Sequence, residues 1–237
     1  MPSDSRTLLA QRLHDVRERI AAACRRAGRS PHEVTLVAVT KTVDSKIAQL
    51  LPELGIFDLG ESRPQELWKK AAELPNTVRW HLVGHLQRNK IERTLPLAKW
   101  IHSVDSARLV EALEQECRKH QVHARVLLEV NASHEEAKQG FEPRQVPEIA
   151  KILSKYPHIE ISGLMTMAAL SDDPELARPT FAELRHLRHQ LRELLGQPNA
   201  LPELSMGMTN DFEVAIEEGA TLVRIGSALF EGLPEAP

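Results

Sequence analysis

A lysine that directly follows a run of apolar and β-branched residues is the first candidate for chemistry. Lys41 ends the stretch Val34-Thr-Leu-Val-Ala-Val-Thr-Lys41. Such a run is typical of a strand buried on both faces of a parallel sheet, and alternation places Lys41 on the same face as Val37 and Val39. Burial disfavours the charged form of a lysine and lowers its pKa, which makes the amine a nucleophile for carbonyl groups. The alternative is that the strand simply ends and Lys41 turns into water.

Two later segments combine glycine with hydroxyl residues just before predicted helical segments. They are Ser205-Met-Gly-Met-Thr-Asn-Asp211 and Gly226-Ser227. Glycine lets backbone amides approach an anion, a hydroxyl adds a hydrogen-bond donor, and the amino end of a helix contributes positive potential. The two segments therefore predict a phosphate site, although each alone is equally consistent with a turn and a helix cap. Neither has the pattern of a nucleotide-binding loop.

A lysine that condenses with an aldehyde, opposite a phosphate cradle, points to pyridoxal phosphate (PLP) as the ligand. Arg224 then gains a role, because it lies on the face of Leu222 in a predicted strand, where an unpaired guanidinium is costly. A guanidinium facing the pyridine nitrogen keeps that nitrogen unprotonated and makes the cofactor a weak electron sink. The alternative is a salt bridge from Arg224 to Asp211 or Glu61.

The elements that must position these residues alternate along the whole chain. We predict strands over residues 34–41, 56–59, 78–83, 100–104, 124–130, 159–164, 203–205 and 221–225. We predict helices over residues 7–27, 45–54, 64–74, 90–98, 106–120, 143–155, 177–195 and 211–218. Strict alternation of strand and helix implies parallel strands with helical crossovers. The prediction is an α/β fold, a single-domain TIM (β/α)8 barrel over residues 1–237, with an extra N-terminal helix within residues 1–30. A doubly wound open sheet is the alternative.

Composition limits the possible partners and compartment. The chain has 237 residues and a formal net charge of −3, which gives no case for nucleic acid or membrane binding. Cys24 and Cys117 are far apart and show no metal-ligand spacing, so we expect reduced thiols and a cytoplasmic location. No apolar run approaches the roughly 18 residues of a membrane span. The first residues lack the apolar stretch of a signal peptide.

Six segments together resemble one known family. They are Ala38-Val-Thr-Lys41, Gly60-Glu-Ser-Arg-Pro-Gln-Glu66, Trp80-His-Leu-Val-Gly-His-Leu-Gln-Arg-Asn-Lys90, Gly163-Leu-Met-Thr-Met167, Leu204-Ser-Met-Gly-Met-Thr-Asn-Asp211 and Val223-Arg-Ile-Gly-Ser227. In number and order they are similar to the signature blocks of the pyridoxal phosphate homeostasis proteins. That family is a single-domain barrel similar to the amino-terminal domain of alanine racemase.

The resemblance implies a role for each matching residue. Lys41 would form the Schiff base (the aldimine) with PLP, and Arg224 would face the ring nitrogen. The phosphate would be held by Ser205, Thr209, Gly226 and Ser227, and the expected cofactor-binding set also includes Ser62 and Met206. Two departures from the family pattern stand out. Ser62 and Pro64 replace the usual Asn and a residue such as Val, and Thr209 replaces the usual Ser while keeping a hydroxyl.

Three functions are compatible with these residues. The first is a non-enzymatic PLP binder, expected to be a monomer, that holds the cofactor or delivers it to apo PLP-dependent enzymes. The second is an amino-acid racemase of the alanine racemase type, which needs a second acid–base group. The only tyrosine, Tyr156, precedes a predicted strand at the opposite end of the barrel, and the chain stops soon after its last strand. The third is a phosphosugar aldolase with Glu129 beside the lysine. We expect no metal site, because His81 and His85 straddle a strand end.

Overall fold

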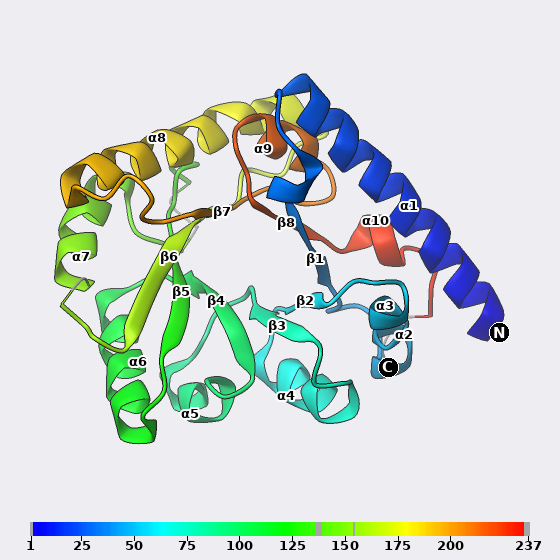
Figure 1. Ribbon diagram of the computed structural model, residues 1–237, viewed down its shortest axis with the longest axis horizontal. Coiled ribbons are helices and arrows are strands. Elements are labelled where there is room, and N and C mark those ends of the chain that lie inside the picture. The colour runs from blue at the N-terminus through cyan, green and yellow to red at the C-terminus, as the bar shows by residue number, and fades with distance from the viewer. Residues whose placement is uncertain (1, 136–138, 154, 235–237) are drawn as a thin grey trace.

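The computed structural model describes residues 2–135, 139–153 and 155–234 and contains a closed barrel of parallel strands (Figure 1). Neighbouring strands follow sequence order, and β1 closes the barrel against β8, with Val37 opposite Arg224. The barrel confirms the TIM-type prediction and excludes the open sheet. The strands are β1 (Thr35–Val39), β2 (Asp58–Glu61), β3 (Arg79–Leu82), β4 (Ala98–Val104), β5 (Ala124–Glu129), β6 (Ile159–Met165), β7 (Glu203–Ser205) and β8 (Leu222–Ile225).

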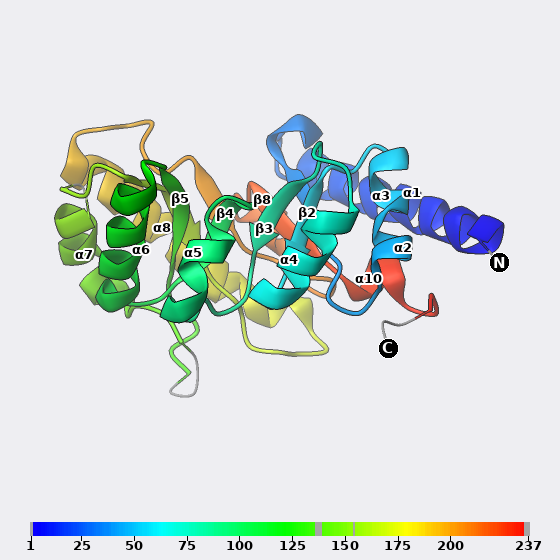
Figure 2. The same ribbon diagram turned by 90° about the horizontal axis from the view of Figure 1, so that it is seen from below.

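Helices follow the strands and surround the barrel (Figures 1 and 2). Short 3-10 turns precede several of them, including η3 (Pro143–Gln145) and η4 (Pro174–Ala177). The α-helices are α1 (Pro2–Arg26), α2 (Ser45–Ala48), α3 (Leu50–Glu53), α4 (Pro64–Glu73), α5 (Ile91–Thr94), α6 (Ala107–His120), α7 (Val146–Leu153), α8 (Arg178–Leu195), α9 (Phe212–Glu217) and α10 (Ser227–Phe230).

The extra N-terminal helix α1 packs on α9 and α10 (Figure 1). Its predicted apolar stripe is buried from Leu9 through Cys24, but Leu8 is exposed. Charged pairs add to the contact, because Arg26 donates to both Glu213 and Glu217 of α9. The predicted helix is therefore confirmed, and it covers the last part of the barrel rather than extending into solvent.

Two predicted helices are shorter than expected because of proline. The segment predicted as one helix over 45–54 forms α2 and α3, separated at Gln49. The ring of Pro52 lies opposite the carbonyl four residues earlier, that of Ala48, and cannot continue the helical hydrogen bonds. Pro96 limits α5 in the same way. The predicted helix over 143–155 begins as η3 and includes Ser154, which lies outside the described residues.

The core has two parts. A large apolar cluster fills the layer between the barrel and its helices. A much smaller one lies inside the barrel and consists of Val37, Leu127, Met165 and Leu222, with Trp100 packed against it. Barrel interiors are usually filled by layers of branched apolar side chains. Here several other interior positions carry buried polar side chains, among them His81, His102 and Arg224.

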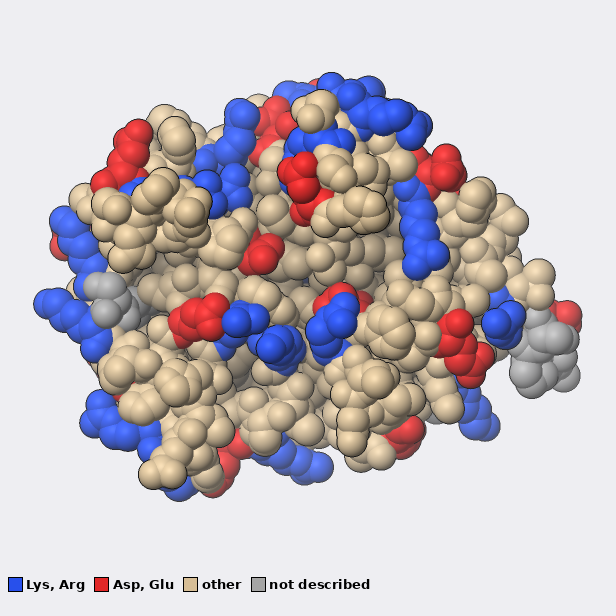
Figure 3. All heavy atoms as spheres, in the orientation of Figure 1, with Lys and Arg blue, Asp and Glu red and all other residues tan. Residues whose placement is uncertain are grey.

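One face of the molecule shows how the surface charges are distributed. On the side shown in Figure 3, acidic and basic side chains are interspersed rather than gathered into a patch of one sign. Among the described residues, no helix combines the length and apolar character needed to cross a bilayer.

Candidate functional site

A pocket of about 440 Å³ opens at the carboxyl ends of the strands. This is the end at which TIM barrels place their sites. Segments that follow five strands and the end of β8 line the pocket. The lining residues are Val39, Lys41, Thr42, Ser62, Val83, Gly84, Met167, Ala169, Leu170, Ser171, Met208, Thr209, Asn210, Asp211, Arg224, Gly226 and Ser227. Six of the predicted site residues therefore meet here: Lys41, Ser62, Thr209, Arg224, Gly226 and Ser227.

Lys41 reaches this pocket from a turn, not from the strand. β1 ends at Val39, and the Lys41 side chain is exposed. The prediction of a lysine buried within the strand is wrong, because the backbone leaves the sheet after Val39 and the alternation of faces no longer applies. The alternative that the strand ends before the lysine is correct, yet Lys41 still lines the pocket.

The backbone just before Lys41 is anchored by a buried ion pair outside the barrel. Lys70 Nζ on α4 donates to the Thr40 carbonyl at 2.7 Å and lies 2.5 Å from Glu61 Oε1. The Thr40 hydroxyl donates to the same Glu61 oxygen at 2.6 Å, and all three residues are buried. Glu61 Oε2 has no hydrogen-bond partner. We call this set the Glu61–Lys70 anchor. It holds the backbone at Thr40 and so determines the position from which the Lys41 side chain extends.

Arg224 is the opposite case, because its guanidinium is buried inside the barrel. The residue is 5% exposed, and its Nη1 donates to Ser205 Oγ at 2.6 Å while its Nη2 donates to the Thr166 carbonyl at 3.0 Å. The predicted alternative of a salt bridge to Glu61 is not formed, because the Glu61 carboxylate pairs with Lys70 outside the barrel, whereas the charge of Asp211 does act on Arg224. Burial lowers the pKa of Arg224 to about 10, with the charges of Asp211 and Glu129 opposing that effect. The side chain therefore remains a cation at neutral pH.

The loops after β7 and β8 provide the predicted hydroxyl groups. Thr209 Oγ1 accepts from the Ala228 amide at 3.3 Å, which ties the first loop to the second. Gly207 has a φ of 90°, and a Cβ there would lie 2.6 Å from that of Ala215, so only glycine lets the chain turn here. The turn places the following residues at the pocket. The Met208 amide donates to Asp211 Oδ1, so this carboxylate holds the loop in shape.

Ser205 and Met206 do not line the pocket. Ser205 Oγ is buried and lies 2.8 Å from His102 Nδ1 as well as 2.6 Å from Arg224 Nη1. The Met206 side chain packs in the large outer cluster, and its amide donates to the Leu222 carbonyl at 3.2 Å. Strand alternation explains both positions. Contact of Ser205 with the phosphate and of Met206 with the cofactor therefore remain predictions.

Sequence reasoning missed the loop that follows β6, which projects from this end of the barrel (yellow, Figure 2). Leu170 in this loop is 88% exposed and lines the pocket together with Ala169 and Ser171. The position of the loop directly after a strand was the available signal, because every strand ends at the same rim. Met167 and Met208 line the pocket, whereas the other methionines at strand ends are buried.

One buried carboxyl group lies at the same end of the barrel. Glu129, the last residue of β5, is 5% exposed. Burial raises its pKa to about 7, and the nearby charge of Asp105 adds to this, while Arg224 and His85 oppose it. Glu129 is not among the residues that line the pocket, so the predicted placement of this carboxylate beside Lys41 in an aldolase site is not supported.

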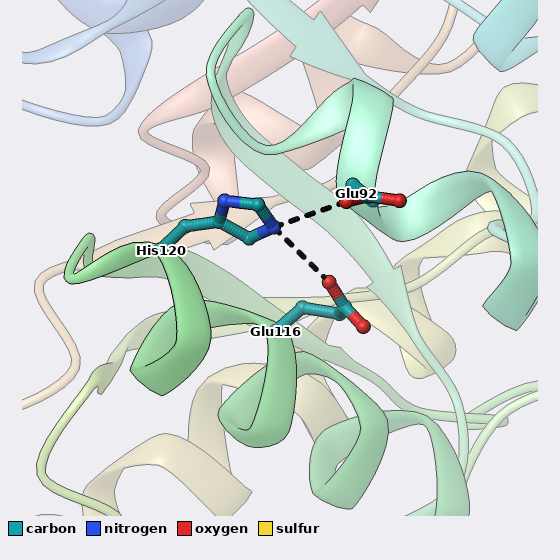
Figure 4. Close-up of side chains that lie close together, drawn as sticks. All are labelled: Glu92, Glu116 and His120. Carbon is teal, nitrogen blue, oxygen red and sulfur yellow. Dashed lines mark ion pairs between the residues drawn. The ribbon is translucent and has the colours of Figure 1, made fainter.

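Histidines and carboxylates elsewhere were also candidates for a metal site. His81 is buried in the barrel, whereas His85 is exposed and lies 3.2 Å from Asp105, so the two do not converge. Among the described residues, Glu92, Glu116 and His120 are close enough to share an ion (Figure 4). Lys119 Nζ already lies 2.9 Å from Glu92 and 3.4 Å from Glu116. This exposed group is an ion-pair cluster that joins α5 to α6.

Comparison with known proteins identifies the family. The model of the alanine racemase N-terminal domain matches residues 12–234. A pyridoxal phosphate homeostasis protein of Aquifex aeolicus is 41% identical over 221 residues, which are 93% of this chain and 96% of that protein. The chain belongs to the pyridoxal phosphate homeostasis protein family. PipY of Synechococcus elongatus, solved with PLP bound, is 31% identical with a TM-score of 0.81 over 94% of this chain and 99% of that one.

The similarity of this chain to the racemases is one of fold. An alanine racemase of Clostridium difficile has a TM-score of 0.74 and 18% identity to this chain. The alignment covers 95% of this chain but 57% of the racemase. The similarity supports a common barrel and says nothing about a common reaction.

Proposed function

We propose that this protein binds PLP in the pocket at the carboxyl end of the barrel and acts as a carrier in PLP homeostasis. The observation that carries the proposal is the convergence of an exposed primary amine, Lys41, and a buried guanidinium, Arg224, on a pocket that also presents several hydroxyl groups. PLP supplies an aldehyde that condenses with a primary amine with loss of water, together with a phosphate and a pyridine nitrogen. The residues present match each of these parts.

The phosphate fits the loops after β7 and β8. Thr209 and Ser227 offer hydroxyl donors, and Gly226 brings the loop close to β1, because a Cβ there would lie 3.3 Å from the Val39 carbonyl. Ser62 lines the same pocket from the end of β2, which keeps it within the proposed binding set. Hydrogen bonds to a charged group are the strong ones, so these few donors can hold a dianion.

Arg224 supports binding and argues against catalysis. It has no acceptor lone pair and stays protonated at neutral pH, so it can donate to the ring nitrogen but cannot accept a proton from it. The pyridine then remains neutral and withdraws electrons weakly. A carboxylate partner would instead keep the nitrogen protonated and make the cofactor a stronger electron sink.

The tyrosine that could serve as the second acid–base group for racemisation also lies outside the pocket. Tyr156 lies just before β6, at the amino end of the barrel, where it packs against the outer core. Each general acid or base typically contributes about 10²–10⁴-fold in rate. We therefore propose a non-enzymatic role, with apo PLP-dependent enzymes as recipients of the cofactor. We propose a monomer in the cytoplasm, which is compatible with two buried free thiols, Cys24 and Cys117.

A paired assay tests this function. The PLP-loaded protein is incubated with L- and D-amino acids while chirality, carbon dioxide and keto acid are followed. In parallel it is mixed with apo PLP-dependent enzymes, and their activity is measured. We expect reactivation of the apo enzymes and no turnover. A rate of about one per second or more on any amino acid, in the ordinary range of enzymes, would overturn the carrier proposal, as would cofactor that is never transferred.

A further inference from the structure

A continuous chain of polar side chains runs through the interior of the barrel to Arg224. Asp58 Oδ1 lies 3.1 Å from His81 Nε2, and His81 Nδ1 lies 2.9 Å from His102 Nε2. His102 Nδ1 then lies 2.8 Å from Ser205 Oγ, which accepts from Arg224 at 2.6 Å. Every member is buried. The chain occupies the interior positions that the small apolar cluster leaves open.

The proton positions along this chain follow from its two ends. Burial acts to raise the pKa of Asp58, but the hydrogen bonds from Arg79 and His81 outweigh it and lower the pKa to about 2. An ionised Asp58 can only accept, so His81 Nε2 carries a proton. Arg224 can only donate, so it donates to Ser205 Oγ, and the serine hydroxyl is free to donate to His102 Nδ1.

The middle of the chain is consistent with both ends. Burial lowers the pKa of His81, although Asp58 opposes this, and burial lowers the pKa of His102 well below its usual value, as do the charges of His81 and Arg224. Both rings are therefore neutral at neutral pH. His102 donates from Nε2 to His81 Nδ1, and each ring has its proton on Nε2. All the hydrogen bonds point the same way, from the guanidinium of Arg224 to the carboxylate of Asp58.

The hydrogen-bonded series of side chains reaches a second cavity on the opposite side of the barrel. Asp58 and Arg79 form an ion pair there, and both line a cavity of about 490 Å³ between the amino ends of the first strands and α1. Arg79 is half exposed in this cavity. The interior chain therefore begins at a solvent-accessible ion pair and ends beside the PLP pocket.

A polar interior of this kind needs a reason, because buried polar groups contribute little net stability and are costly when any one is left unpaired. We propose that Ser205, His102, His81 and Asp58 are positioning residues that hold the Arg224 guanidinium in one orientation toward the cofactor ring, and that they couple the pocket to the charge at the far cavity. This inference rests on the proposed PLP site. It gives Ser205 a role through Arg224 in place of contact with phosphate.

The first test needs no cofactor. Nitrogen-15 NMR of histidine-labelled, PLP-free protein at neutral pH reports the tautomer of each ring. We expect His81 and His102 to be neutral, with the proton on Nε2. A proton on Nδ1 of either ring, or an imidazolium, would contradict the assigned chain whether or not PLP binds.

The second test compares two substitutions of one residue. In His102→Gln the amide oxygen can accept from Ser205 and the amide nitrogen can donate to His81, whereas His102→Leu can do neither. We expect PLP affinity to fall about ten- to a hundredfold in His102→Leu, as for the loss of a hydrogen bond to a charged group, and to stay near wild type in His102→Gln. His186→Leu, an exposed histidine on α8, is the matched control and should not change affinity.

The pH titration of the visible band of the bound cofactor separates positioning from general loss of structure. A guanidinium fixed beside the ring disfavours protonation of the bound cofactor, so its release in His102→Leu should raise the titration midpoint, and His102→Gln should leave it unchanged. If His102→Leu does not fold, Ser205→Ala interrupts the same chain one bond closer to Arg224 and should give the same two effects. Wild-type affinity and midpoint in the folded variant would overturn the inference while leaving the PLP site intact. Failure of the wild-type protein to bind PLP would instead overturn the proposed function.

Discussion

Lys41 and Arg224 reach one pocket from neighbouring strands, but the protein holds them in opposite ways. Lys41 is exposed, and only the backbone before it is fixed, by the Glu61–Lys70 anchor outside the barrel. Arg224 is buried, and its side chain is fixed directly by hydrogen bonds inside the barrel. The difference matches the two proposed tasks. A group that captures and releases a cofactor must move, whereas a group that sets the charge beside the ring must not.

The largest expected effect concerns the region that supports Lys41. Lys70→Met leaves the Glu61 carboxylate buried without a cation, and breaking a buried ion pair in this way costs about 3–5 kcal/mol in unfolding free energy. Lys69→Met, one position away on the exposed face of α4, is the control and should cost little. Urea denaturation measures both. Equal stability of the two variants would mean that the Glu61–Lys70 anchor does not support the strand end.

Glu129 tests the electrostatics of the region around Arg224. Its pKa is raised to about 7 in the folded protein from a usual value near 4.5. The stability that protonated Glu129 contributes should therefore be fully present below pH 4.5 and be lost as the pH rises to 7. Glu129→Gln removes this loss, which should favour the variant by up to about 3 kcal/mol above pH 7. Unfolding free energy is measured across this range for Glu129→Gln and for the exposed control Glu111→Gln. A difference from wild type that does not change with pH would show that Glu129 ionises normally.

The smallest expected effects concern the phosphate loops, where each hydroxyl is one donor among several. Thr209→Ala and Ser227→Ala should each weaken PLP binding by about 1.5–3 kcal/mol, or roughly ten- to a hundredfold. Thr77→Ala is the control, because Thr77 is exposed and precedes β3 at the other end of the barrel. Equilibrium dialysis measures the affinities. If both loop variants bind PLP like Thr77→Ala, the phosphate lies elsewhere.

The sequence predicted the barrel because its strands and helices alternate with clear periodicity. It also predicted the end of the barrel where Lys41, Thr209, Arg224 and Gly226 meet, since parallel strands share one rim. Errors arose where a single residue overrides a pattern. Pro52 interrupts a predicted helix, and the polypeptide leaves the sheet after Val39, so the alternation used to bury Lys41 stops two residues before it.

The supporting networks could not be predicted in the same way. The Glu61–Lys70 anchor joins a strand to the helix that follows it. The hydrogen-bonded side chains from Asp58 to Arg224 come from five strands. No local pattern marks such contacts, because they depend on strand register and on side chains that meet across the barrel. Ser205 illustrates this limit. Its position in a segment that contains glycine and hydroxyl residues predicted phosphate binding. Its side chain instead points into the barrel and accepts a hydrogen bond from Arg224.

The central claim is that the exposed amine, Lys41, carries the cofactor covalently. The most direct measurement is mass spectrometry of a digest after the protein has been mixed with PLP and reduced with borohydride, which converts the linkage to a stable secondary amine. The account predicts a single modified peptide that contains Lys41. It also predicts no modification in Lys41→Ala and normal modification in Lys46→Ala, the exposed lysine of α2. Modification of a different lysine, or equal labelling of Lys41→Ala, would contradict it.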